Sequence, residues 1–488
     1  MATYDFDMGI LGGGAAGLTV AAGAAQAGAK VLLVEKEGRL GGDCLYYGCV
    51  PSKTLIRSAQ VYHLMKNASR FGLPEVGLPS PDYQEVAKRI QSVIGTIKKH
   101  DSEERFCNLG AKVKYGNASF VDEHVISLNG TRHSARYWVI ATGSSAAIPP
   151  VEGLKATPYI TNKEIYSLGK LPASMVIIGG GPIGIEFAQA FTRLGTKVTV
   201  VEFLSQILNA DDRDMTDIVT HVLKSEGVEF YLDSAVKNTR AVGNEIEVVF
   251  QKGDGTKTVG AETLLVATGR GANLEGLGLE NIGVALDRRG LKLDEKLRTT
   301  QRHIFGAGDV TGVYQFTHAA GYEGGIVLSN AIFHFPRKAN YTYLPWVTYT
   351  DPELASIGIN EKSAKAKGIN YSVWSDEFVN NDRSLAEGES IGKIKMLLDD
   401  KEKPIGVQIL GPQAGDLLSE WVAVMNGKVK LSTLASAVHP YPTLGEINKR
   451  VAGNLLATKI FSENMKKALK FFFSLKGRAC EAGTHVLH

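Results

Sequence analysis

The feature that most constrains the fold of this chain is a glycine-rich pattern that occurs twice. In the first copy, an apolar run at 6–11 leads into the glycine-rich turn 12–17, a stretch of small residues follows, and a second apolar run at 31–34 ends at Glu35. This order of apolar run, glycine turn, helix-forming stretch and apolar run predicts a strand–helix–strand unit. The first copy therefore predicts the start of a parallel α/β domain.

The second copy has the same parts in the same order. An apolar run at 175–178 leads into the turn 179–184, and a later run at 198–201 ends at Glu202. The acidic residue follows the first glycine of the turn by 23 positions in both copies. A repeat of this length and regularity predicts two separate dinucleotide sites.

Each type of residue in these turns has a role in holding a dinucleotide. The glycines allow a tight turn and let the backbone approach the pyrophosphate, whose charge meets the helix N-terminus, while the acidic side chain accepts from a ribose hydroxyl. The predicted ligands are Gly12, Gly14, Gly17 and Glu35 in the first copy and Gly179, Gly181, Gly184 and Glu202 in the second.

Length and composition limit the class of protein. A chain of 488 residues with 44% hydrophobic positions is long enough for about three globular domains. The formal net charge of +3, without a long basic block interleaved with aromatic residues, argues against nucleic acid as a partner. No run approaches the roughly 18 apolar residues of a membrane-spanning helix, and no signal peptide precedes the first strand-like run, so we expect a cytoplasmic protein.

Two cysteines form the most reactive motif. The segment 41–53, GGDCLYYGCVPSK, places Cys44 and Cys49 five residues apart at the predicted start of a helix, with Lys53 close behind. A helix N-terminus and a nearby cation both favour the thiolate, which is the reactive form. A resident metal would need more ligands, and the next cysteine, Cys107, is far away in sequence. We therefore predict a redox pair, and no resident metal site.

Taken together, the motifs resemble those of a known family. The segment 41–53, the two glycine patterns, ATGS at 141–144, ATGR at 267–270 and GAGD at 306–309 stand in the order found in class I pyridine nucleotide-disulfide oxidoreductases. This family includes dihydrolipoamide dehydrogenase, glutathione reductase and mercuric reductase. The resemblance covers residues 5–460 and implies FAD, a nicotinamide nucleotide and a homodimer.

The implied fold is α/β, with two Rossmann-like dinucleotide-binding domains, the NAD domain inserted in the FAD domain, and a C-terminal α+β dimerisation domain. The expected boundaries are 1–152 and 273–344 for the FAD-binding domain with its central part, 153–272 for the NAD-binding domain, 345–460 for the dimerisation domain, and 461–488 for a basic aromatic tail.

The resemblance also implies roles for single residues. Cys49 would be the thiolate beside the flavin, and Cys44 the interchange thiol that meets the substrate. Lys53 and Glu186 match an ion pair beside the flavin, where a cation favours negative charge on the ring. Otherwise Glu186 is a solvated helical carboxylate. The remaining implied cofactor ligands are Gly42, Gly143, Gly269 and Asp309, the last on the ribityl chain.

Glu202 bears on the choice of coenzyme. A carboxylate at the end of this strand accepts from the 2′-hydroxyl of NADH and repels the 2′-phosphate of NADPH, which usually meets an arginine. No arginine follows until Arg213. We therefore expect NAD(H) in preference to NADP(H).

The chain departs from the disulfide reductases near its C-terminus. These enzymes carry His-Pro-Thr and then a glutamate, and that histidine serves as base and acid for the interchange thiol. Here the segment 439–446 is HPYPTLGE, so that aligning Pro-Thr and Glu446 puts Tyr441 in the place of the histidine and leaves His439 two residues upstream. A phenol with a pKa of about 10 is a poor substitute for an imidazole with a pKa of about 6.5.

A tyrosine at this position is similar to mercuric reductase, which however also has a pair of adjacent cysteines at its C-terminus where this chain has only Cys480. The first interpretation is a mercuric-reductase-like enzyme acting on a thiol-ligated metal ion or another small-molecule acceptor. The second is a dihydrolipoamide dehydrogenase-like enzyme in which His439 replaces the missing base. The third is an electron-delivery flavoprotein that docks through residues 459–478, whose lysines and phenylalanines suit either an anionic membrane surface or a protein contact.

Overall fold

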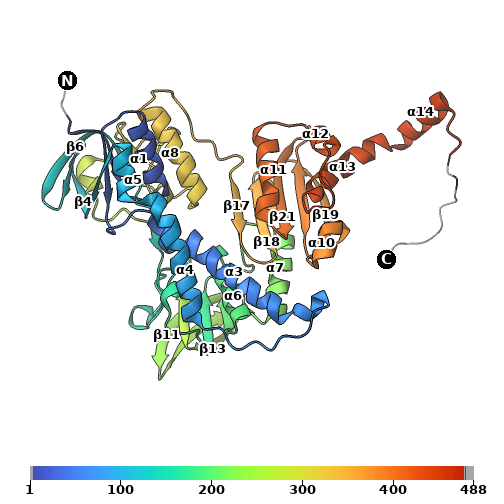
Figure 1. The fold of residues 1–488 in the computed structure, drawn as a ribbon, viewed down its shortest axis with the longest axis horizontal. Helices are drawn as coiled ribbons and strands as arrows, with labels where there is room; N and C mark the ends of the chain where they lie inside the picture. Colours follow the sequence, from blue (N-terminus) through green and yellow to red (C-terminus); the bar gives the residue numbers. More distant parts are fainter. Residues whose placement is uncertain (1–3, 478, 480–488) are drawn as a thin grey trace. The chain divides into compact units, whose positions relative to one another are not determined.

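The structure is a computed structural model that describes residues 4–477 and 479. The chain forms two compact units. Figure 1 colours the chain by residue number, from blue at the N-terminus to red at the C-terminus. The first unit ends at Leu344 and also takes in Thr348–Thr350. The second unit comprises Pro345–Val347 and the chain from Asp351 onward.

The largest sheet of the first unit has seven strands in the order β3-β2-β1-β6-β5-β4, with β16 also paired to β6. The pairs that involve β1, β2, β3, β16 and the second half of β6 are parallel, and β4, β5 and the start of β6 form an antiparallel extension. The strands are β1 (Phe6–Leu11), β2 (Val31–Glu35), β3 (Ala111–Tyr115), β4 (Ala118–Asp122), β5 (Val125–Leu128), β6 (Thr131–Ile140) and β16 (Ile304–Gly306).

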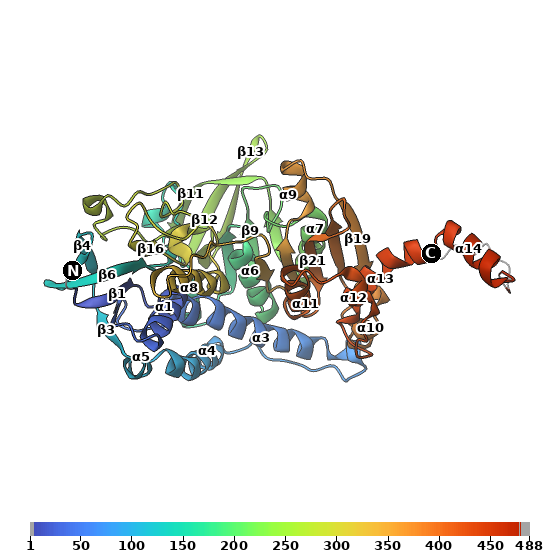
Figure 2. The same cartoon turned by 90° about the horizontal axis from the view of Figure 1, so that it is seen from above.

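The parallel strands are apolar throughout because both of their faces are covered. β2 is buried along its whole length, and β1 at all positions but one. A strand covered on both faces is continuously apolar, whereas a half-exposed strand alternates. Helices α1 (Ala15–Gln26) and α8 (Thr317–Ala331) lie side by side and share one core with strand residues (Figure 1, Figure 2).

The second glycine-rich copy forms a smaller parallel sheet in the order β10-β9-β8-β14. Next to it in sequence is an antiparallel sheet, β11-β12-β13, and a short pair, β7 with β15, completes the strands of this unit. The bounds are β7 (Ser144–Ala146), β8 (Ser174–Ile178), β9 (Lys197–Val201), β10 (Glu229–Tyr231), β11 (Ser234–Val242), β12 (Glu245–Lys252), β13 (Gly255–Ala261), β14 (Thr263–Val266) and β15 (Arg270–Ala272). The other α-helices of the unit are α2 (Gly42–Tyr46), α3 (Cys49–Lys66), α4 (Tyr83–Ile97), α5 (Glu103–Leu109), α6 (Pro182–Leu194) and α7 (Arg213–Glu226).

The second unit is built on a five-stranded sheet in the order β17-β18-β21-β20-β19. Its pairs β18 with β21, β20 with β21 and β19 with β20 are antiparallel. The strands are β17 (Pro345–Thr348), β18 (Glu353–Gly358), β19 (Ser372–Glu377), β20 (Lys393–Leu398) and β21 (Pro404–Gly411), and the helices are α9 (Glu361–Ala366), α10 (Asp382–Glu387), α11 (Ala414–Asn426), α12 (Leu431–Ser436), α13 (Glu446–Ile460) and α14 (Glu463–Phe473).

The fold class expected from the sequence is confirmed, and both copies of the repeat form the predicted strand–turn–helix–strand units. The expected boundary between FAD and NAD domains stays a prediction, because the first unit holds both parallel sheets. Within the described residues, no helix combines the length and apolar character required to cross a membrane.

The third glycine of each turn lies where the helix packs against the backbone of the turn that precedes it. A Cβ atom on Gly17 would lie 1.8 Å from the carbonyl oxygen of Gly12, and a Cβ on Gly184 would lie 2.2 Å from that of Gly179. These are backbone atoms, so no side chain can move aside. The close approach of helix to turn therefore depends on glycine at both positions.

We expect Gly17→Ala to destabilise the protein by about 1–3 kcal/mol, because the added methyl group forces α1 away from the turn. The matched control is Gly95→Ala in α4, where an added Cβ meets no atom within 4 Å and the position is exposed. Alanine in an exposed helix interior should stabilise by about 0.5–1 kcal/mol. Denaturant unfolding of both variants measures this, and equal stabilities would contradict the packing argument.

Candidate functional site

The first nucleotide turn is held by Glu35 at the end of β2. Its Oε2 accepts from the Gly13 backbone N–H at 2.6 Å, and its Oε1 accepts from the Glu37 N–H at 2.7 Å. The carboxylate is buried, yet each oxygen has a second lone pair with which it can accept from a ribose hydroxyl. The side chain that we predicted to bind a ribose thus also shapes the turn.

The second turn repeats this arrangement atom for atom. Oε2 of Glu202 accepts from the Gly180 N–H, and Oε1 accepts from the Leu204 N–H at 2.7 Å. The residue after Glu202 is Phe203, whose side chain is exposed, and residues 203–212 include no lysine or arginine.

The second glycine of each turn indicates that the residues present fit a bound dinucleotide. A Cβ on Gly181 would meet no protein atom within 4 Å, and a Cβ on Gly14 would meet only the Cα of Gly42, at 3.8 Å. Packing within the protein therefore gives no reason for glycine here. A pyrophosphate that passes close over the N-terminus of α1 or α6 does give one, since it needs bare backbone at this point.

Gly42 contributes to the same turn from the other side. Its φ angle is +61°, and a Cβ there would lie 2.7 Å from the Cα of Gly14. The cysteine-bearing segment therefore packs directly on the first nucleotide turn, backbone against backbone.

The two thiols belong to two different helices. The sequence predicted both at the start of one helix, and this is wrong for Cys44, which lies inside the short helix α2, while Cys49 is the first residue of α3. The reason is the break at Tyr47 and Gly48, since glycine is a poor helix former. Both cysteines are free thiols, so the structure shows the reduced form of the pair.

The environment makes the two thiols unequal. The hydrogen bond from Cys44 lowers the pKa of Cys49 to about 6, and the Thr317 hydroxyl, 3.4 Å from its Sγ, and the charge of Lys53 act in the same direction against the effect of burial. The same hydrogen bond, together with burial, raises the pKa of Cys44. Near neutral pH, Cys49 is therefore the thiolate and Cys44 the thiol.

Lys53 lies one helical turn after Cys49 and is paired with Glu186 of α6. Its Nζ lies 2.8 Å from Oε2 of Glu186, whose Oε1 accepts from the Tyr349 N–H at 2.9 Å. Burial by itself lowers the pKa of Lys53, but the charge and hydrogen bond of Glu186 outweigh it and raise the pKa. Glu186 is only 6% exposed, so it is not the solvated carboxylate of the alternative interpretation.

The strands that follow the two Ala-Thr-Gly motifs pair with each other. Gly143 precedes β7, Gly269 precedes β15, and these strands are antiparallel, with Arg270 opposite Ala146. The Gly143 carbonyl also accepts from the Asn273 N–H at 3.0 Å. The strands after the two motifs, which are more than 100 residues apart in sequence, therefore meet in one short sheet.

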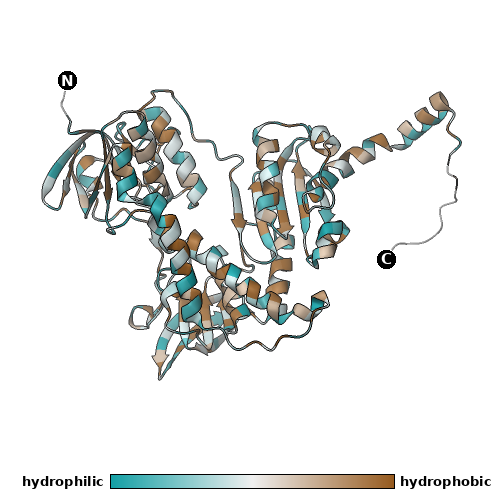
Figure 3. Cartoon of the chain, in the orientation of Figure 1, coloured by the Kyte–Doolittle hydropathy of each residue, from teal (hydrophilic) through white to brown (hydrophobic). Residues whose placement is uncertain are grey.

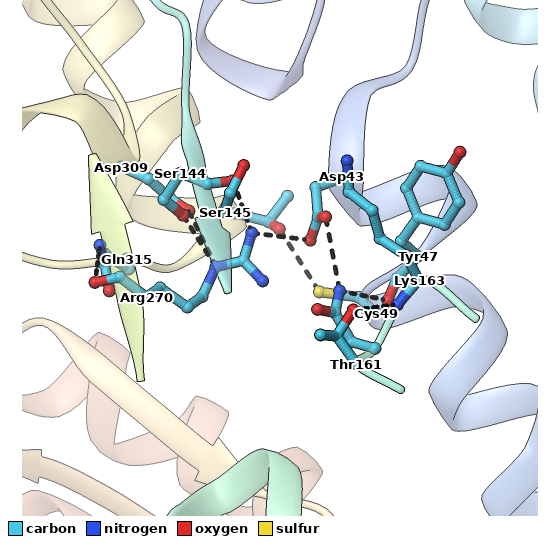
Figure 4. Close-up of polar contacts among 12 residues, drawn as sticks. Asp43, Tyr47, Cys49, Ser144, Ser145, Thr161, Lys163, Arg270, Asp309 and Gln315 are labelled. Carbon is cyan, nitrogen blue, oxygen red and sulfur yellow. Dashed lines mark hydrogen bonds and ion pairs between the residues drawn. The ribbon is translucent and has the colours of Figure 1, made fainter. Parts of the chain in front are cut away.

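Arg270 is the centre of a charged network that the sequence did not reveal (Figure 4). Its Nη2 lies 3.1 Å from Oδ2 of Asp43, and its Nε donates to the Ser144 hydroxyl at 2.7 Å. That hydroxyl donates to Oδ2 of Asp309 at 2.6 Å, and burial raises the pKa of Asp309. Arg270 therefore links the segment that carries the thiols to Asp309, the predicted ribityl ligand.

The residues that sequence reasoning missed stand next to motifs that it quoted. Asp43 precedes Cys44, Arg270 ends ATGR, and Ser144 ends ATGS. Their charge and position were visible, but pairing between segments more than 100 residues apart was not. Thr317, which contacts Cys49, carried no signal of its own, because a threonine near a glycine turn is common.

The C-terminal candidates lie in the second unit. His439 has both ring nitrogens engaged, Nε2 with Oε1 of Glu420 at 3.0 Å and Nδ1 with the Ala437 carbonyl at 3.2 Å. The Tyr441 side chain is 71% exposed, and its hydroxyl donates to Asp382 at 2.9 Å, which raises its pKa.

Glu446 is the first residue of α13, and its Oε2 lies 3.5 Å from the Thr443 backbone N–H. Cys107 is an exposed free thiol, and Cys480 lies outside the described residues. For Cys107, the described residues show no contact that assigns it a role in catalysis.

Curated relatives of this chain include a dihydrolipoyl dehydrogenase and a mercuric reductase. It is 34% identical over 463 residues to a dihydrolipoyl dehydrogenase of Bacillus subtilis, a match that covers 91% of this chain and 97% of that protein. It is 31% identical over 468 residues to a mercuric reductase of Bacillus cereus, covering 95% of this chain and 73% of that protein.

Solved structures give the same family. The copper(II) complex of the HOCl-induced flavoprotein disulfide reductase RclA from Escherichia coli superposes with a TM-score of 0.83 at 26% identity, over 93% of this chain and 100% of that one. Residues 6–324 match the family described as pyridine nucleotide-disulphide oxidoreductase, and residues 344–452 match its dimerisation domain. The chain therefore belongs to the pyridine nucleotide-disulphide oxidoreductase family of flavoenzymes, which use FAD and a pyridine nucleotide.

Proposed function

We propose that this enzyme is an NADH-driven reductase that passes two electrons through FAD and the Cys44–Cys49 disulfide to a soft metal ion held by thiol ligands. One observation carries the choice of acceptor: no imidazole is free to serve the interchange thiol from the segment 439–446. Tyr441 stands in the expected place of the histidine, and both ring nitrogens of His439 are engaged within the second unit.

The residues around the thiols support this direction of electron flow. Bound FAD would accept a hydride from NADH and reduce the disulfide. Lys53 supplies a positive charge one turn from Cys49, and Glu186 and Tyr349 hold that charge in position. The first residue of a helix is a favourable position for a thiolate, which explains why Cys49 is the sulfur that stays ionised.

Cys44 then meets the acceptor as a thiol. When a metal ion arrives bound to small thiols, the Cys44 sulfur bonds to the metal, one small thiolate leaves, and the proton of Cys44 goes to it. This exchange conserves protons and requires no base from the enzyme. The Cys49 thiolate then attacks the Cys44 sulfur and re-forms the Cys44–Cys49 disulfide, while the electron pair of the broken Cys44–metal bond reduces the metal ion, which releases its remaining small thiolate. Thiolate ligands select soft metal ions, which supports a soft ion as the acceptor.

The second candidate is a dihydrolipoamide dehydrogenase-like enzyme, and its specific support is the likeness to the Bacillus subtilis enzyme. In that reaction the dithiol of dihydrolipoamide must lose its protons as it becomes the disulfide of lipoamide, so a general base contributes to the rate. His439 would have to leave both Glu420 and Ala437 to serve as that base. This requirement makes the metal ion the preferred acceptor.

For the electron donor, we infer NAD(H) in preference to NADP(H). The carboxylate of Glu202 at the end of β9 favours a 2′-hydroxyl and repels a 2′-phosphate. Arg213, the first arginine to follow, is paired with Asp217 at 3.7 Å. The dimerisation domain at 344–452 supports a homodimer, and we propose that the enzyme works in the cytoplasm.

The acceptor is tested by following NADH oxidation with an Hg(II)–thiol complex and with lipoamide, side by side. We expect metal-dependent turnover to exceed lipoamide turnover at least tenfold in kcat/KM. Tyr441→His should raise lipoamide turnover on the order of 100-fold, because it restores a general base. His439→Ala should leave both activities within about twofold. Fast lipoamide turnover that collapses in His439→Ala would instead support the second candidate.

The unequal thiols give a separate prediction. In the reduced enzyme, alkylation of Cys49 should show a pH midpoint near its pKa of about 6. Cys44→Ala removes the hydrogen bond that stabilises the thiolate, so the midpoint should rise toward about 8.5. Cys44→Ser keeps a donor and is the matched control, with a smaller rise. Peptide mass spectrometry separates Cys49 from Cys107, and identical midpoints in all three proteins would refute the assignment.

The two equivalent glutamates provide a matched test of coenzyme choice. Glu202→Gln removes the negative charge, so kcat/KM for NADH should fall about 10-fold or more and the preference over NADPH should shrink. Glu35→Gln makes the same change in the other turn, and it should weaken FAD retention while the NADH to NADPH ratio stays unchanged. A shift of that ratio in Glu35→Gln, or none in Glu202→Gln, would show that the two sites are assigned wrongly.

A further inference from the structure

Helix α14, Glu463–Phe473, is amphipathic although it lies beyond the family's dimerisation domain, which ends at 452. Met465, Ala468, Leu469 and Phe472 are spaced three and four residues apart and so form one apolar face. The lysines at 466, 467 and 470 fall on the opposite face. Such a helix normally covers its apolar face with protein or with lipid.

The described part of the second unit does not cover this face. No residue of α14 is buried, and the exposed fractions of Phe471, Phe472 and Phe473 are 81%, 74% and 71%. The preceding helix α13 has its last buried residue at Leu455, after which the chain leaves the core of the unit. Both views show α14 projecting beyond the sheet of its unit (Figure 1, Figure 2), and Figure 3 shows strongly apolar residues along it.

The positive charge of the chain is concentrated in the same place. The segment 459–477 holds five lysines and one glutamate, whereas the whole chain has a formal net charge of only +3. Lys459 is paired with Glu402 and Lys466 with Glu463. No ion pair is formed by Lys467, Lys470 or Lys476 with the residues that the structure describes, so their charge is available to a partner.

We propose that α14 and the residues up to Lys476 bind the surface of an anionic lipid bilayer, with the apolar face among the acyl chains and the lysines at the headgroups. Three observations carry this: the unburied apolar face, the three consecutive phenylalanines, and the lysines opposite. Aromatic and aliphatic residues on one face with lysines on the other are the features of helices that lie in the bilayer interface.

Lipid fits this helix better than a groove on a protein. Consecutive helical residues point about 100° apart, so Phe471, Phe472 and Phe473 together span roughly 200° of the helix circumference. A protein groove receives one narrow stripe, whereas lipid chains adapt to a broad apolar end. At 11 residues the helix is about 16 Å long, against about 30 Å of hydrocarbon in a bilayer, so it would lie on the membrane and not span it.

The inference does not depend on which acceptor the enzyme reduces. It places the reaction at an anionic surface, such as the cytoplasmic leaflet, whose negative potential also concentrates cations. Each lysine near such a surface contributes about 1 kcal/mol, which is about a fivefold change in binding. Salt should therefore weaken the association, whereas it would strengthen a purely apolar one.

The test uses the full FAD-loaded enzyme with vesicles of phosphatidylcholine alone and of phosphatidylcholine with phosphatidylglycerol in equal parts. We expect sedimentation with the anionic vesicles and little with the neutral ones. Lys467→Glu with Lys470→Glu should reduce the apparent affinity on the order of 100-fold or more. Changing Phe471, Phe472 and Phe473 to serine should abolish binding. NADH oxidation and FAD content should remain unchanged in both, because α14 contributes none of the predicted catalytic or cofactor-binding residues.

The matched control is Lys428→Glu with Lys430→Glu, which reverses the same charge at exposed positions of the same unit, and it should bind like the unaltered enzyme. An equal loss in this control would mean that net charge alone drives sedimentation, and this would overturn the proposal. So would equal binding to both vesicle types or no binding at all. If instead the serine variant changed the oligomeric state in light scattering while vesicles had no effect, the occupant of this face would be a second copy of the chain.

Discussion

The ion pair between Lys53 and Glu186 joins the helix that carries Cys49 to the helix that follows the second nucleotide turn. Lys53 lies one turn into the helix that begins at Cys49, and Glu186 lies near the start of the helix that follows the second nucleotide turn. The pair thus connects the reactive thiol to the turn predicted to hold NADH, and Tyr349 fixes the other carboxylate oxygen. Ion pairs with one buried partner add little net stability, but removing one partner costs about 3–5 kcal/mol. The pair is best understood as a constraint on geometry, because it holds the Lys53 charge beside Cys49 and joins α3 to α6.

Arg270 likewise holds charged groups from distant segments in fixed positions. It links Asp43, which precedes Cys44, to Ser144 and Asp309. Asp43 and Asp309 are like charges in a partly buried region, and burial together with the charge of Asp43 raises the pKa of Asp309. The guanidinium between them offsets this repulsion. The short sheet of β7 and β15 brings Arg270 to this position, so backbone pairing between two distant motifs determines where the charge lies.

Local sequence patterns were sufficient to predict the parts of the fold that depend on residues close together in the sequence. The glycine turns, their strands and the acidic residue at each strand end follow from steric limits on the backbone, so both copies could be predicted. The break between α2 and α3 was missed because a spacing of five positions between the two cysteines fits one helix as well as two. The Arg270 network and the His439–Glu420 pair could not be found, because they join segments whose proximity depends on the tertiary fold.

The two units differ in how strongly the structure constrains the types of their functional residues, and this difference bears on function. The first unit carries residues whose types are constrained by geometry, namely the glycines of the two turns, Cys44 within α2 and Cys49 at the start of α3. The second unit carries the departures from the disulfide reductases, Tyr441 and the helix α14, at exposed positions. Exposed side chains can change without cost to folding, whereas the buried turn residues cannot. The turns and thiols of the first unit are therefore the constrained part of this molecule, whereas the residues proposed to determine acceptor and location lie at exposed positions that are free to vary.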